Sequence, residues 1–479
     1  MEIKVHNNIL DKEQTKAALT NNKNTIIIAG AGSGKSLTMV GKIKYLVKYK
    51  NIKLDEILCI TFTNNAAISL QEKIKNELKK DNKVYTFHKL ALEIIKDNKK
   101  NYNICNDDLL EYLVHEIFYS IKSKYFEKLL LNKNYLDSNE FINYKNTIIK
   151  FIKLFIANYY DITYFDKIIN KAKQRDKPTL LIIKKIYEIY LLEKKSSKEM
   201  DFDDMIYIAT RLVKNNGINK NYKYIIIDEY QDTSKIRENL VKEIMKKTNA
   251  FITVVGDDFQ SIYRFSGCDI KNFLNFSKNF KHVKKLYLTN TYRNSKELIN
   301  VAGSFIMKNN RQIKKLLKSN KHLIKPIIIL YYKDIKKDFT KAINYIDSNN
   351  LMILGRNNND LYYCIDKKYI INNTLNIKDK NIYYKTIHKA KGLEEENVLI
   401  INLTNNVNSL PSKIKDEKIL NYILLHKEYY PYEEERRLFY VALTRTKNYC
   451  YLFVDKNNPS IFIEELVKDF KKYISFVHL

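Results

Sequence analysis

The stretch IIIAGAGSGKSLTMV, residues 26–40, constrains the fold of this chain more than any other segment. The 479-residue sequence contains only 10 glycines, and three of them, Gly30, Gly32 and Gly34, lie here. A β-branched apolar run precedes them and is typical of a buried parallel strand, whereas the residues after them have helical spacing. The order strand, glycine-rich loop, helix predicts a loop whose bare backbone N–H groups hold phosphate.

The loop matches the pattern G-x-x-x-x-G-K-[ST] from Gly30 to Ser36. In this pattern the lysine, here Lys35, reaches the β- and γ-phosphates of a nucleoside triphosphate, and the hydroxyl of Ser36 binds Mg²⁺. The N-terminus of the following helix adds positive potential. The alternative is a chance glycine turn, which is disfavoured because both flanking segments have the expected character.

Two further strand ends carry residues suited to the same chemistry. The apolar run 224–227 ends in Asp228 and Glu229, which predicts that Asp228 holds Mg²⁺ through water and that Glu229 polarises an attacking water. The run beginning at Phe251 ends in GDDFQSIYRF, whose Gln260 is a candidate sensor of the γ-phosphate. The alternative for such an acidic pair is solvated surface charge.

The formal net charge of +30 suggests a polyanionic partner such as nucleic acid. The alternative is compositional, since the chain is rich in Lys, Asn, Ile and Tyr, as an AT-rich coding sequence would produce. The 5 cysteines are scattered without metal-ligand spacing, which predicts a reduced intracellular protein. The start MEIKVHNNIL has no apolar signal segment and lysines interrupt every apolar run, so we expect a cytoplasmic protein without a membrane span; a viral or organellar origin stays open.

Taken in chain order, a series of motifs resembles the UvrD/Rep family of superfamily 1A DNA helicases. The resemblance is carried by LDKEQ (10–14), AGAGSGKS (29–36), TFTNNAA (61–67), TFHKL (86–90), DFDDMI (201–206), DEYQDT (228–233), GDDFQSIYRF (256–265), NTYRNS (290–295), TIHKAKGLE (386–394) and EEERRLFYVALTR (433–445). Each motif alone is moderately specific, whereas the ordered series covers nearly the whole chain and is highly specific.

The resemblance implies an α/β fold with two RecA-like P-loop NTPase domains, each a parallel sheet flanked by helices. We expect the first core to comprise residues 1–88 and 200–285, and the second core to comprise residues 286–479. Residues 89–199 have helical apolar spacing, as in 112–131 and 180–195, which predicts an α-helical insertion in the first core. Only a short segment separates LMILGRNNNDL from YYKTIHKAKG, so the second accessory domain of the family is expected to be missing.

The resemblance also implies ATP and Mg²⁺ as cofactors, with ATP in the cleft between the cores. The implied catalytic residues are Lys35, Asp228, Glu229, Gln260, Arg293 and Arg445; the implied nucleotide-binding residues are Gln14, Ala29, Gly30, Ala31, Gly32, Ser33, Gly34, Lys35, Ser36, Tyr292 and Glu394; and the metal ligands are Ser36 and Asp228. In this scheme Gln14 reads adenine, Tyr292 stacks on it, and Glu394 contacts the ribose. Arg293 and Arg445 point at the γ-phosphate from the second core. Arg436 and Arg437 are better explained as structural.

The resemblance further implies contacts with single-stranded DNA, made by Thr61, Phe62, Asn64, His88, Tyr263, Phe265 and His388. Stacking on aromatic side chains is tolerant of sequence, which suits a motor that walks over any strand. The alternative for the aromatic residues is core packing, and His388 could instead hold a loop by hydrogen bonding.

The implied function is an ATP-dependent helicase that moves 3′ to 5′ on single-stranded DNA and unwinds duplexes, in replication, repair or recombination. Its expected partners are single-stranded DNA and single-strand/duplex junctions, with no membrane; a protein loading partner stays open. One alternative is a DNA-stimulated ATPase that translocates but unwinds weakly. Another is a non-catalytic DNA-binding assembly subunit, and an RNA substrate is a less similar option.

Overall fold

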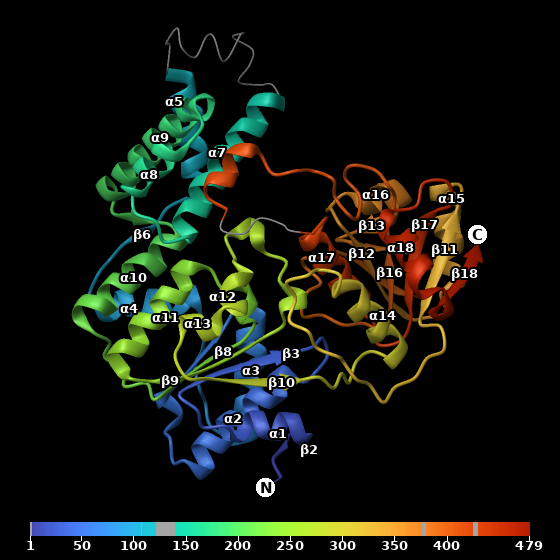
Figure 1. The fold of residues 1–479 in the computed structure, drawn as a ribbon, viewed down its shortest axis with the longest axis horizontal. Helices are drawn as coiled ribbons and strands as arrows, with labels where there is room; N and C mark the ends of the chain where they lie inside the picture. The colour runs from blue at the N-terminus through green and yellow to red at the C-terminus, as the bar shows by residue number, and fades with distance from the viewer. Residues whose placement is uncertain (1, 107, 121–138, 376–379, 425–429) are drawn as a thin grey trace.

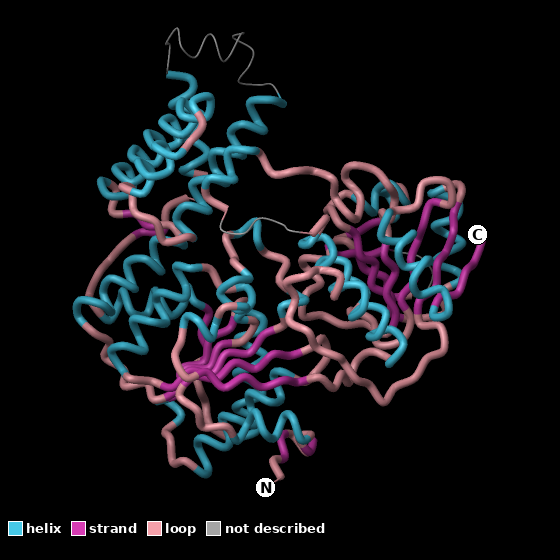
Figure 2. Tube along the Cα trace, viewed as in Figure 1, coloured by secondary structure: helices cyan, strands magenta, loops and turns pink. Residues whose placement is uncertain are grey.

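The computed structural model describes residues 2–106, 108–120, 139–375, 380–424 and 430–479. Figure 1 shows two lobes, each with a sheet, and a group of helices that extends from the first lobe. Figure 2 shows the strands at the centre of each lobe with helices around them. The predicted α/β class is therefore confirmed. The first sheet is parallel throughout, as expected, whereas the second carries short antiparallel strands at one edge.

The first sheet has six strands in the order β10-β3-β9-β8-β4-β5, and all neighbours are parallel. Its strands are β3 (Asn24–Ala29), β4 (Ile57–Thr61), β5 (Val84–Thr86), β8 (Tyr224–Ile227), β9 (Phe251–Gly256) and β10 (Val283–Leu288). The predicted strands at the glycine loop, at the acidic pair and at GDDFQ are β3, β8 and β9. β10 crosses the expected boundary at 285/286, because it continues the first sheet beside β3.

Helices cover both faces of this sheet because its strands are apolar on both sides. Ile27 and Ala29 of β3 face one cluster, whereas Ile26 and Ile28 face the other. The first face packs against α1 (Lys12–Leu19), α2 (Lys35–Tyr49) and α3 (Asn64–Leu78). The second packs against α4 (Phe87–Asp97), α10 (Phe202–Asn216), α11 (Lys235–Thr248), α12 (Ile270–Leu274) and α13 (Phe276–Asn279). A hairpin, β1 (Lys4–Val5) and β2 (Asn8–Ile9), precedes α1.

The insertion consists of α5 (Leu109–Ser120), α7 (Asn139–Ala157), α8 (Tyr164–Lys171) and α9 (Lys177–Ser196). Residues 121–131 of the predicted helical segment lie outside the described part of the chain. Its core is aromatic, and Phe155 stacks on Phe165 at 4.2 Å between ring centroids. One feature was not predicted: β6 (Asn103–Ile104) pairs with β7 (Glu199–Met200) where the chain leaves and rejoins the first lobe. Among the described residues, no helix has the length and apolar character needed to cross a bilayer.

The second sheet has eight strands in the order β13-β14-β15-β12-β16-β17-β11-β18. They are β11 (Ile327–Tyr332), β12 (Asn350–Gly355), β13 (Ile370–Ile371), β14 (Thr374–Leu375), β15 (Asn381–Thr386), β16 (Asn397–Ile400), β17 (Cys450–Asp455) and β18 (Ile474–His478). The predicted strands KPIIIL and LMILG are β11 and β12. One face packs against α14 (Lys296–Ile306), α17 (Glu433–Leu443) and α18 (Ile461–Phe470), and the other against α15 (Ile335–Tyr345) and α16 (Asp360–Cys364). Between β12 and β15, the described residues form only α16, a turn and the β13–β14 hairpin.

The two lobes touch through residues that belong to neither sheet. Ala31 of the glycine loop and Phe259 of GDDFQ are buried in the same apolar cluster as α14 and α17 of the second lobe. Phe259 meets Tyr440 edge to face, with 5.2 Å between ring centroids. The ends of the first sheet's strands are therefore packed directly against the second lobe.

Candidate nucleotide and nucleic-acid sites between the lobes

The glycine-rich loop, which we call the phosphate-binding loop after its predicted role, lies between β3 and α2, as predicted. Gly32 (φ +70°) and Gly34 (φ +73°) are left-handed, a conformation that glycine adopts without strain. A Cβ at Gly32 would lie 2.6 Å from Thr291 Oγ1, so glycine is also required by the close approach of the NTYRNS segment. The backbone N–H of Tyr292 donates to the Gly32 carbonyl at 2.9 Å. The loop is thus in direct contact with the segment that leads into the second lobe.

Lys35 and the acidic pair at the end of β8 form one electrostatic unit. Lys35 Nζ lies 2.5 Å from Glu229 Oε1. Burial and the neighbouring Glu229 charge raise the pKa of Asp228 to about 6. Burial works against the charge of Glu229, but Lys35 outweighs it and lowers the pKa of Glu229 to about 2. Burial likewise opposes the charge of Lys35, yet the two carboxylates raise its pKa. At neutral pH the unit holds one ammonium and two carboxylates.

The donors at this edge of the sheet suit Mg²⁺ and phosphate. Ser36 in the first turn of α2 and Asp228 after β8 offer hydroxyl and carboxylate oxygens, the ligands that Mg²⁺ prefers. β3 and β8 both flank β9, so their carboxyl ends lie at one edge of the sheet. The hydroxyl of Ser33 is buried and has no hydrogen-bond partner among the described residues. These observations fit the predicted cofactors.

The raised pKa of Asp228 predicts how the stability of the protein changes with pH. Its pKa is 3.8 ordinarily and about 6 in the fold, so its contribution is favourable below pH 3.8 and is lost as the pH rises through 6. Above that pH the fold has lost about 3 kcal/mol of stability relative to its stability below pH 3.8. Asp228→Asn is therefore expected to stabilise the ligand-free protein more at pH 8 than at pH 5, by about 1 kcal/mol. Thermal unfolding at both pH values measures this, with the exposed Asp347→Asn as control; equal shifts at both would contradict it.

Gln260 lies between the two lobes. Its side-chain carbonyl accepts from Arg445 Nη2 at 3.2 Å, and its Nε2 donates to Asp257 Oδ2 at 2.6 Å. Asp257 also pairs at 2.6 Å with Lys315, whose side chain is fully buried. Burial and the positive charge of Arg293 lower the pKa of Arg445 to about 9, so Arg445 stays charged at neutral pH. The predicted sensor and one predicted arginine are therefore brought together.

Arg293 is held by two contacts with residues of the second lobe. Its Nε donates to Glu394 Oε2 at 2.7 Å, and its Nη1 donates to the Thr444 carbonyl at 3.2 Å. Burial opposes the charge of Glu394, but the guanidinium of Arg293 lowers its pKa overall. Glu394, the predicted ribose contact, therefore pairs directly with Arg293 in this structure.

Two residues predicted to contact adenine have other partners in this structure. The ring of Tyr292 is 62% exposed, and its hydroxyl donates to Asp11 at 2.5 Å. Gln14 is buried, donates from Nε2 to the Ser33 carbonyl at 3.1 Å and accepts from the Asp11 N–H at 3.1 Å. Gln14 therefore braces the phosphate-binding loop, whereas Tyr292 presents an open ring face beside it.

Four of the predicted DNA contacts form one aromatic cluster across the lobes. Phe62 stacks on Tyr263 with 5.6 Å between centroids, and Phe265 meets His388 edge to face at 5.5 Å. The hydroxyl of Tyr263 donates to the His388 carbonyl at 3.0 Å. Phe265 is 54% exposed, which core packing does not explain. Burial and the neighbouring Arg356 lower the pKa of His388 to about 4, so its imidazole is neutral at physiological pH.

The other three predicted contacts lie outside this cluster. Thr61 is buried, and its hydroxyl donates to the Thr63 carbonyl at 3.2 Å. Asn64 is the exposed first residue of α3. His88 packs edge to face on Phe202 at 5.4 Å, and burial lowers its pKa to about 4.

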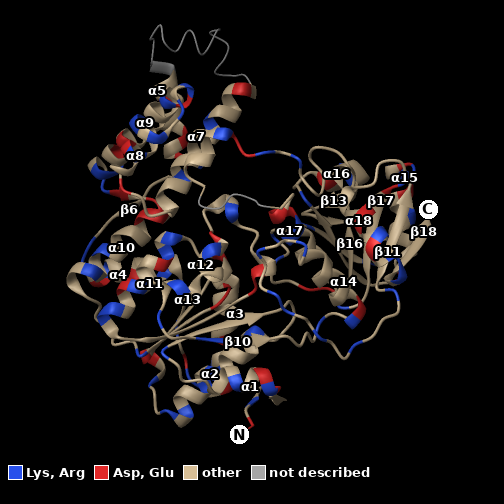
Figure 3. Cartoon of the chain, viewed as in Figure 1, with Lys and Arg blue, Asp and Glu red and all other residues tan. Residues whose placement is uncertain are grey.

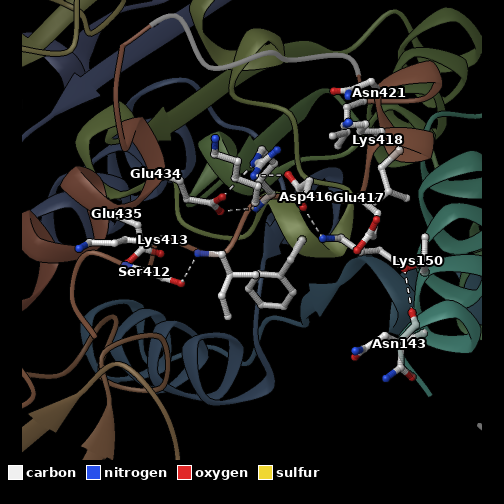
Figure 4. Close-up of a pocket in the computed structure, with 18 of the residues that line it drawn as sticks. Asn143, Lys150, Ser412, Lys413, Asp416, Glu417, Lys418, Asn421, Glu434 and Glu435 are labelled. Carbon is white, nitrogen blue, oxygen red and sulfur yellow. Dashed lines mark hydrogen bonds and ion pairs between the residues drawn. The ribbon is translucent and has the colours of Figure 1, made fainter. Parts of the chain in front are cut away.

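A cavity of about 2040 Å³ adjoins the aromatic cluster. It is about twice the upper size of a typical small-ligand pocket, so it suits a polymer. Tyr263, Phe265 and His388 line it, together with α7 of the insertion and residues 412–424 (Figure 4). Amides and basic groups are numerous in the lining, namely Asn143, Asn146, Asn357, Asn358, Asn359, Asn421, Lys150, Lys173, Arg175, Arg264, Arg356, Lys389, Lys413, Lys415 and Lys418. Fewer acidic groups line it, namely Asp176, Asp416, Glu417, Glu434 and Glu435. In the view of Figure 3, Lys and Arg are spread over both lobes, so net charge alone would not have located this cavity.

Three residues of these sites were not among the predicted site residues. Lys391 Nζ donates to the Gln260 carbonyl at 2.6 Å and pairs with Asp232, which links the lobes between the two sites. Arg237 lies over the Phe62 ring at 4.9 Å. Lys391 falls inside TIHKAKGLE and Arg237 is one of the few arginines, so both had a signal in the sequence. Lys315 had none, because it lies in a lysine-rich stretch without a motif.

The side chains of Arg436 and Arg437 contact other residues of the chain. Arg436 forms a two-pronged pair with Glu465, at 2.8 and 2.7 Å. Arg437 donates from Nε to the Ser261 carbonyl at 2.7 Å. These contacts join α17 to α18 and to the first lobe, in line with the structural role expected of them.

Comparison with known proteins agrees with this geometry. The description "UvrD/REP helicase N-terminal domain" matches residues 10–281, and "UvrD-like helicase C-terminal domain" matches residues 365–457. A probable DNA helicase II homolog of Mycoplasma capricolum is 32% identical over 65% of this chain and 43% of its own length. Rep of Buchnera aphidicola subsp. Baizongia pistaciae is 32% identical over 65% of this chain and 45% of its own. DNA helicase IV of Escherichia coli is 26% identical over 96% of this chain and 70% of its own.

This chain thus spans less than half the length of the first two relatives. The N-terminal family model nevertheless covers more than half of its residues, in the lobe that carries the phosphate-binding loop. The chain belongs to the UvrD/REP helicase family.

Proposed function

We propose that this chain is an ATP-driven motor that moves 3′ to 5′ along single-stranded DNA and separates the strands of a duplex. The observation that carries the proposal is the contact between the lobes at the phosphate-binding loop, where Gln260 meets Arg445 at 3.2 Å. A triphosphate at this junction would touch both lobes, so its hydrolysis would change how they are held together. The relatives' names, DNA helicase II, Rep and DNA helicase IV, support ATP and DNA as substrates.

In this proposal each group at the junction has a distinct task. Lys35 and the loop N–H groups hold the phosphates, and Glu229 orients and polarises the attacking water. Ser36 and Asp228 hold Mg²⁺, which neutralises charge on the β- and γ-oxygens when bound. The Lys35–Glu229 pair would separate as the phosphates take the lysine. Glu229 would then be free to act on water only when a triphosphate is present.

The second lobe would supply the rest of the site. Arg293 and Arg445 would stabilise the charge of the transferred phosphoryl group, and Gln260 would report its presence. Tyr292 would stack on the base through its open face. We propose domain boundaries of 1–88 and 200–288 for the first core, 89–199 for the insertion and 289–479 for the second core. The shift from 285 to 288 follows from the pairing of β10 with β3.

Single-stranded DNA would lie in the cavity of about 2040 Å³ beside the aromatic cluster. Tyr263, Phe265 and His388 would stack on bases, and the basic and amide groups of the lining would contact phosphates. Because Tyr263 bonds to the second lobe and Lys391 bonds to Gln260, a change at the nucleotide would reach the DNA within a few residues.

The proposed function predicts strong stimulation of ATPase activity by single-stranded DNA. With oligo(dT) we expect turnover to rise at least tenfold, and DNA affinity to fall steeply between 50 and 200 mM salt because phosphate contacts release counterions. Duplexes with 3′ or 5′ single-stranded tails then test direction: only the 3′-tailed duplex should be unwound. An ATPase indifferent to DNA would favour a non-catalytic assembly role.

A second candidate is a translocase that unwinds weakly. It is favoured by the short segment between β12 and β15, where the described residues form only α16, a turn and a small hairpin. DNA-stimulated ATPase without strand separation on either tailed duplex would support this candidate.

A further inference from the structure

Residues 412–424, which we call the strap, run from the second lobe to the helical insertion (Figure 1). In the second lobe the strap begins at Ser412, whose N–H donates to Glu435 of α17 at 3.0 Å. It continues into a 3₁₀ turn, Lys418–Tyr422, which lies against α7. The strap is thus a bridge between the lobes that belongs to neither sheet.

The far end of the strap is built into the apolar core of the insertion. Leu420 is 1% exposed and Ile423 is 2% exposed, and both belong to the cluster that contains the buried face of α7. Asn158, just after α7, donates its Nδ2 to the Ile423 carbonyl at 2.9 Å, and this contact is buried. Such an anchor resists salt, because it rests on apolar burial and not on exposed charge.

Ion pairs and a hydroxyl fasten the strap at two further points. Asp416 lies 2.7 Å from Lys150 of α7 and 2.8 Å from Arg264 of the first lobe. Figure 4 shows Asp416 and Lys150 joined on the wall of the cavity. The hydroxyl of Tyr422 donates to Asp176 at 2.8 Å. The strap is therefore held along its length.

The strap completes a circuit of chain around the cavity. Its residues line the cavity together with α7 and the aromatic cluster. On another side the lobes are joined directly, since Arg445 bonds to Gln260 at 3.2 Å and Arg437 bonds to the Ser261 carbonyl at 2.7 Å. The circuit is therefore closed by contacts. The first lobe contacts the insertion, the insertion contacts the strap, the strap contacts the second lobe, and the second lobe contacts the first.

We propose that the strap encloses the single strand, so that this chain loads by threading and selects strands with a free end. The inference rests on the proposed function, because it takes the cavity as the path of the strand. In this proposal a linear strand passes under the strap while the anchors on α7 stay in place. A covalently closed circle has no end to thread and can load only when the anchors on α7 open. Lys413, Lys415 and Lys418 of the strap line the cavity and would contact phosphates of the enclosed strand.

A crosslink tests this directly. The five native cysteines, Cys59, Cys105, Cys268, Cys364 and Cys450, are all buried, so introduced cysteines can be modified selectively. Lys150→Cys with Asp416→Cys places a thiol on each side of the strap–α7 contact, and a flexible bismaleimide locks them. ATPase stimulation is then measured with a linear oligo(dT) and a circular oligo(dT) of the same length, added after crosslinking.

The locked protein should keep its response to the linear strand and lose at least tenfold of its response to the circle. The same double variant without crosslinker should respond to both strands. If circular and linear oligo(dT) stimulate the ATPase of the locked protein equally, the strap inference is wrong. It is also wrong if locking abolishes stimulation by the linear strand. If neither strand stimulates the unlocked variant or the unmodified protein, the proposed function itself fails.

A second variant weakens the strap without any crosslink. Ile423→Ala removes part of the buried anchor and should speed loading onto circular DNA severalfold. Ile371→Ala, at a residue of β13 that is 62% exposed and does not line the cavity, is the matched control and should leave that rate unchanged. A rate on circles that Ile423→Ala does not alter would contradict the assignment of the anchor.

Discussion

Lys35→Ala is expected to lower ATP turnover at least 100-fold while leaving binding of single-stranded DNA measurable. Lys35 Nζ lies 2.5 Å from Glu229 Oε1 of the acidic pair, and in the proposal it transfers to the phosphates. Alanine removes that charge and leaves Glu229 and Asp228 without it. ATPase at saturating oligo(dT) measures turnover, and fluorescence anisotropy of a labelled strand measures DNA binding.

Lys48→Ala is the matched control, because Lys48 is an exposed residue in the last turn of the same helix, α2. It should leave both turnover and DNA binding unchanged. Thermal unfolding of both variants separates a lost catalytic group from a lost fold, since removing one partner of a buried pair also destabilises. Turnover in Lys35→Ala close to that of the parent protein would overturn the assignment of the phosphate-binding loop.

Arg293→Ala is expected to lower kcat about 1000-fold and to change nucleotide affinity only severalfold. Arg293 follows the segment that touches Gly32 and is held by Glu394 at 2.7 Å. Its charge would act on the phosphoryl group during transfer rather than on the bound triphosphate, so kcat and not binding carries the loss. Arg293→Lys should recover little, because lysine lacks the planar fork.

Arg211→Ala controls for the loss of an arginine, since Arg211 is an exposed residue of α10 that lies 6.0 Å from the Tyr207 ring. Steady-state kinetics and binding of a fluorescent ATP analogue distinguish the two effects. If Arg293→Ala lost nucleotide binding and kcat in parallel, Arg293 would be a structural brace for the loop.

Local features of this protein followed from neighbouring residues in the chain. The strands β3, β8 and β9 were predicted because buried parallel strands read as unbroken apolar runs. The turn before Lys35 was predicted because only glycine combines a positive φ with bare backbone, as at Gly32 and Gly34. The motif series added the order of the two cores, and the family comparison agrees with it.

Contacts between distant residues could not be predicted in this way. Asn158 and Ile423 are separated by 265 positions, and neither lies in a motif or at a recognisable spacing. Lys315 is one lysine among many until the fold buries it beside Asp257. The β6–β7 pair joins two residues from each end of the insertion. Strands of two residues are too short to show an alternating pattern of apolar and polar residues. Gln14 was matched to a motif, but the contact of its amide with the Ser33 carbonyl could not be predicted from that match.

The sequence by itself determined the long apolar strands, the glycine-rich loop and the identity of the acidic pair, because each depends on residues adjacent in the chain. Only the tertiary structure decided which side chains meet across the lobes, how the strap returns to α7 and which aromatic rings line the cavity. The physical reason is that burial and ion pairing act between surfaces. A surface is assembled from segments whose separation along the chain carries no periodic signal.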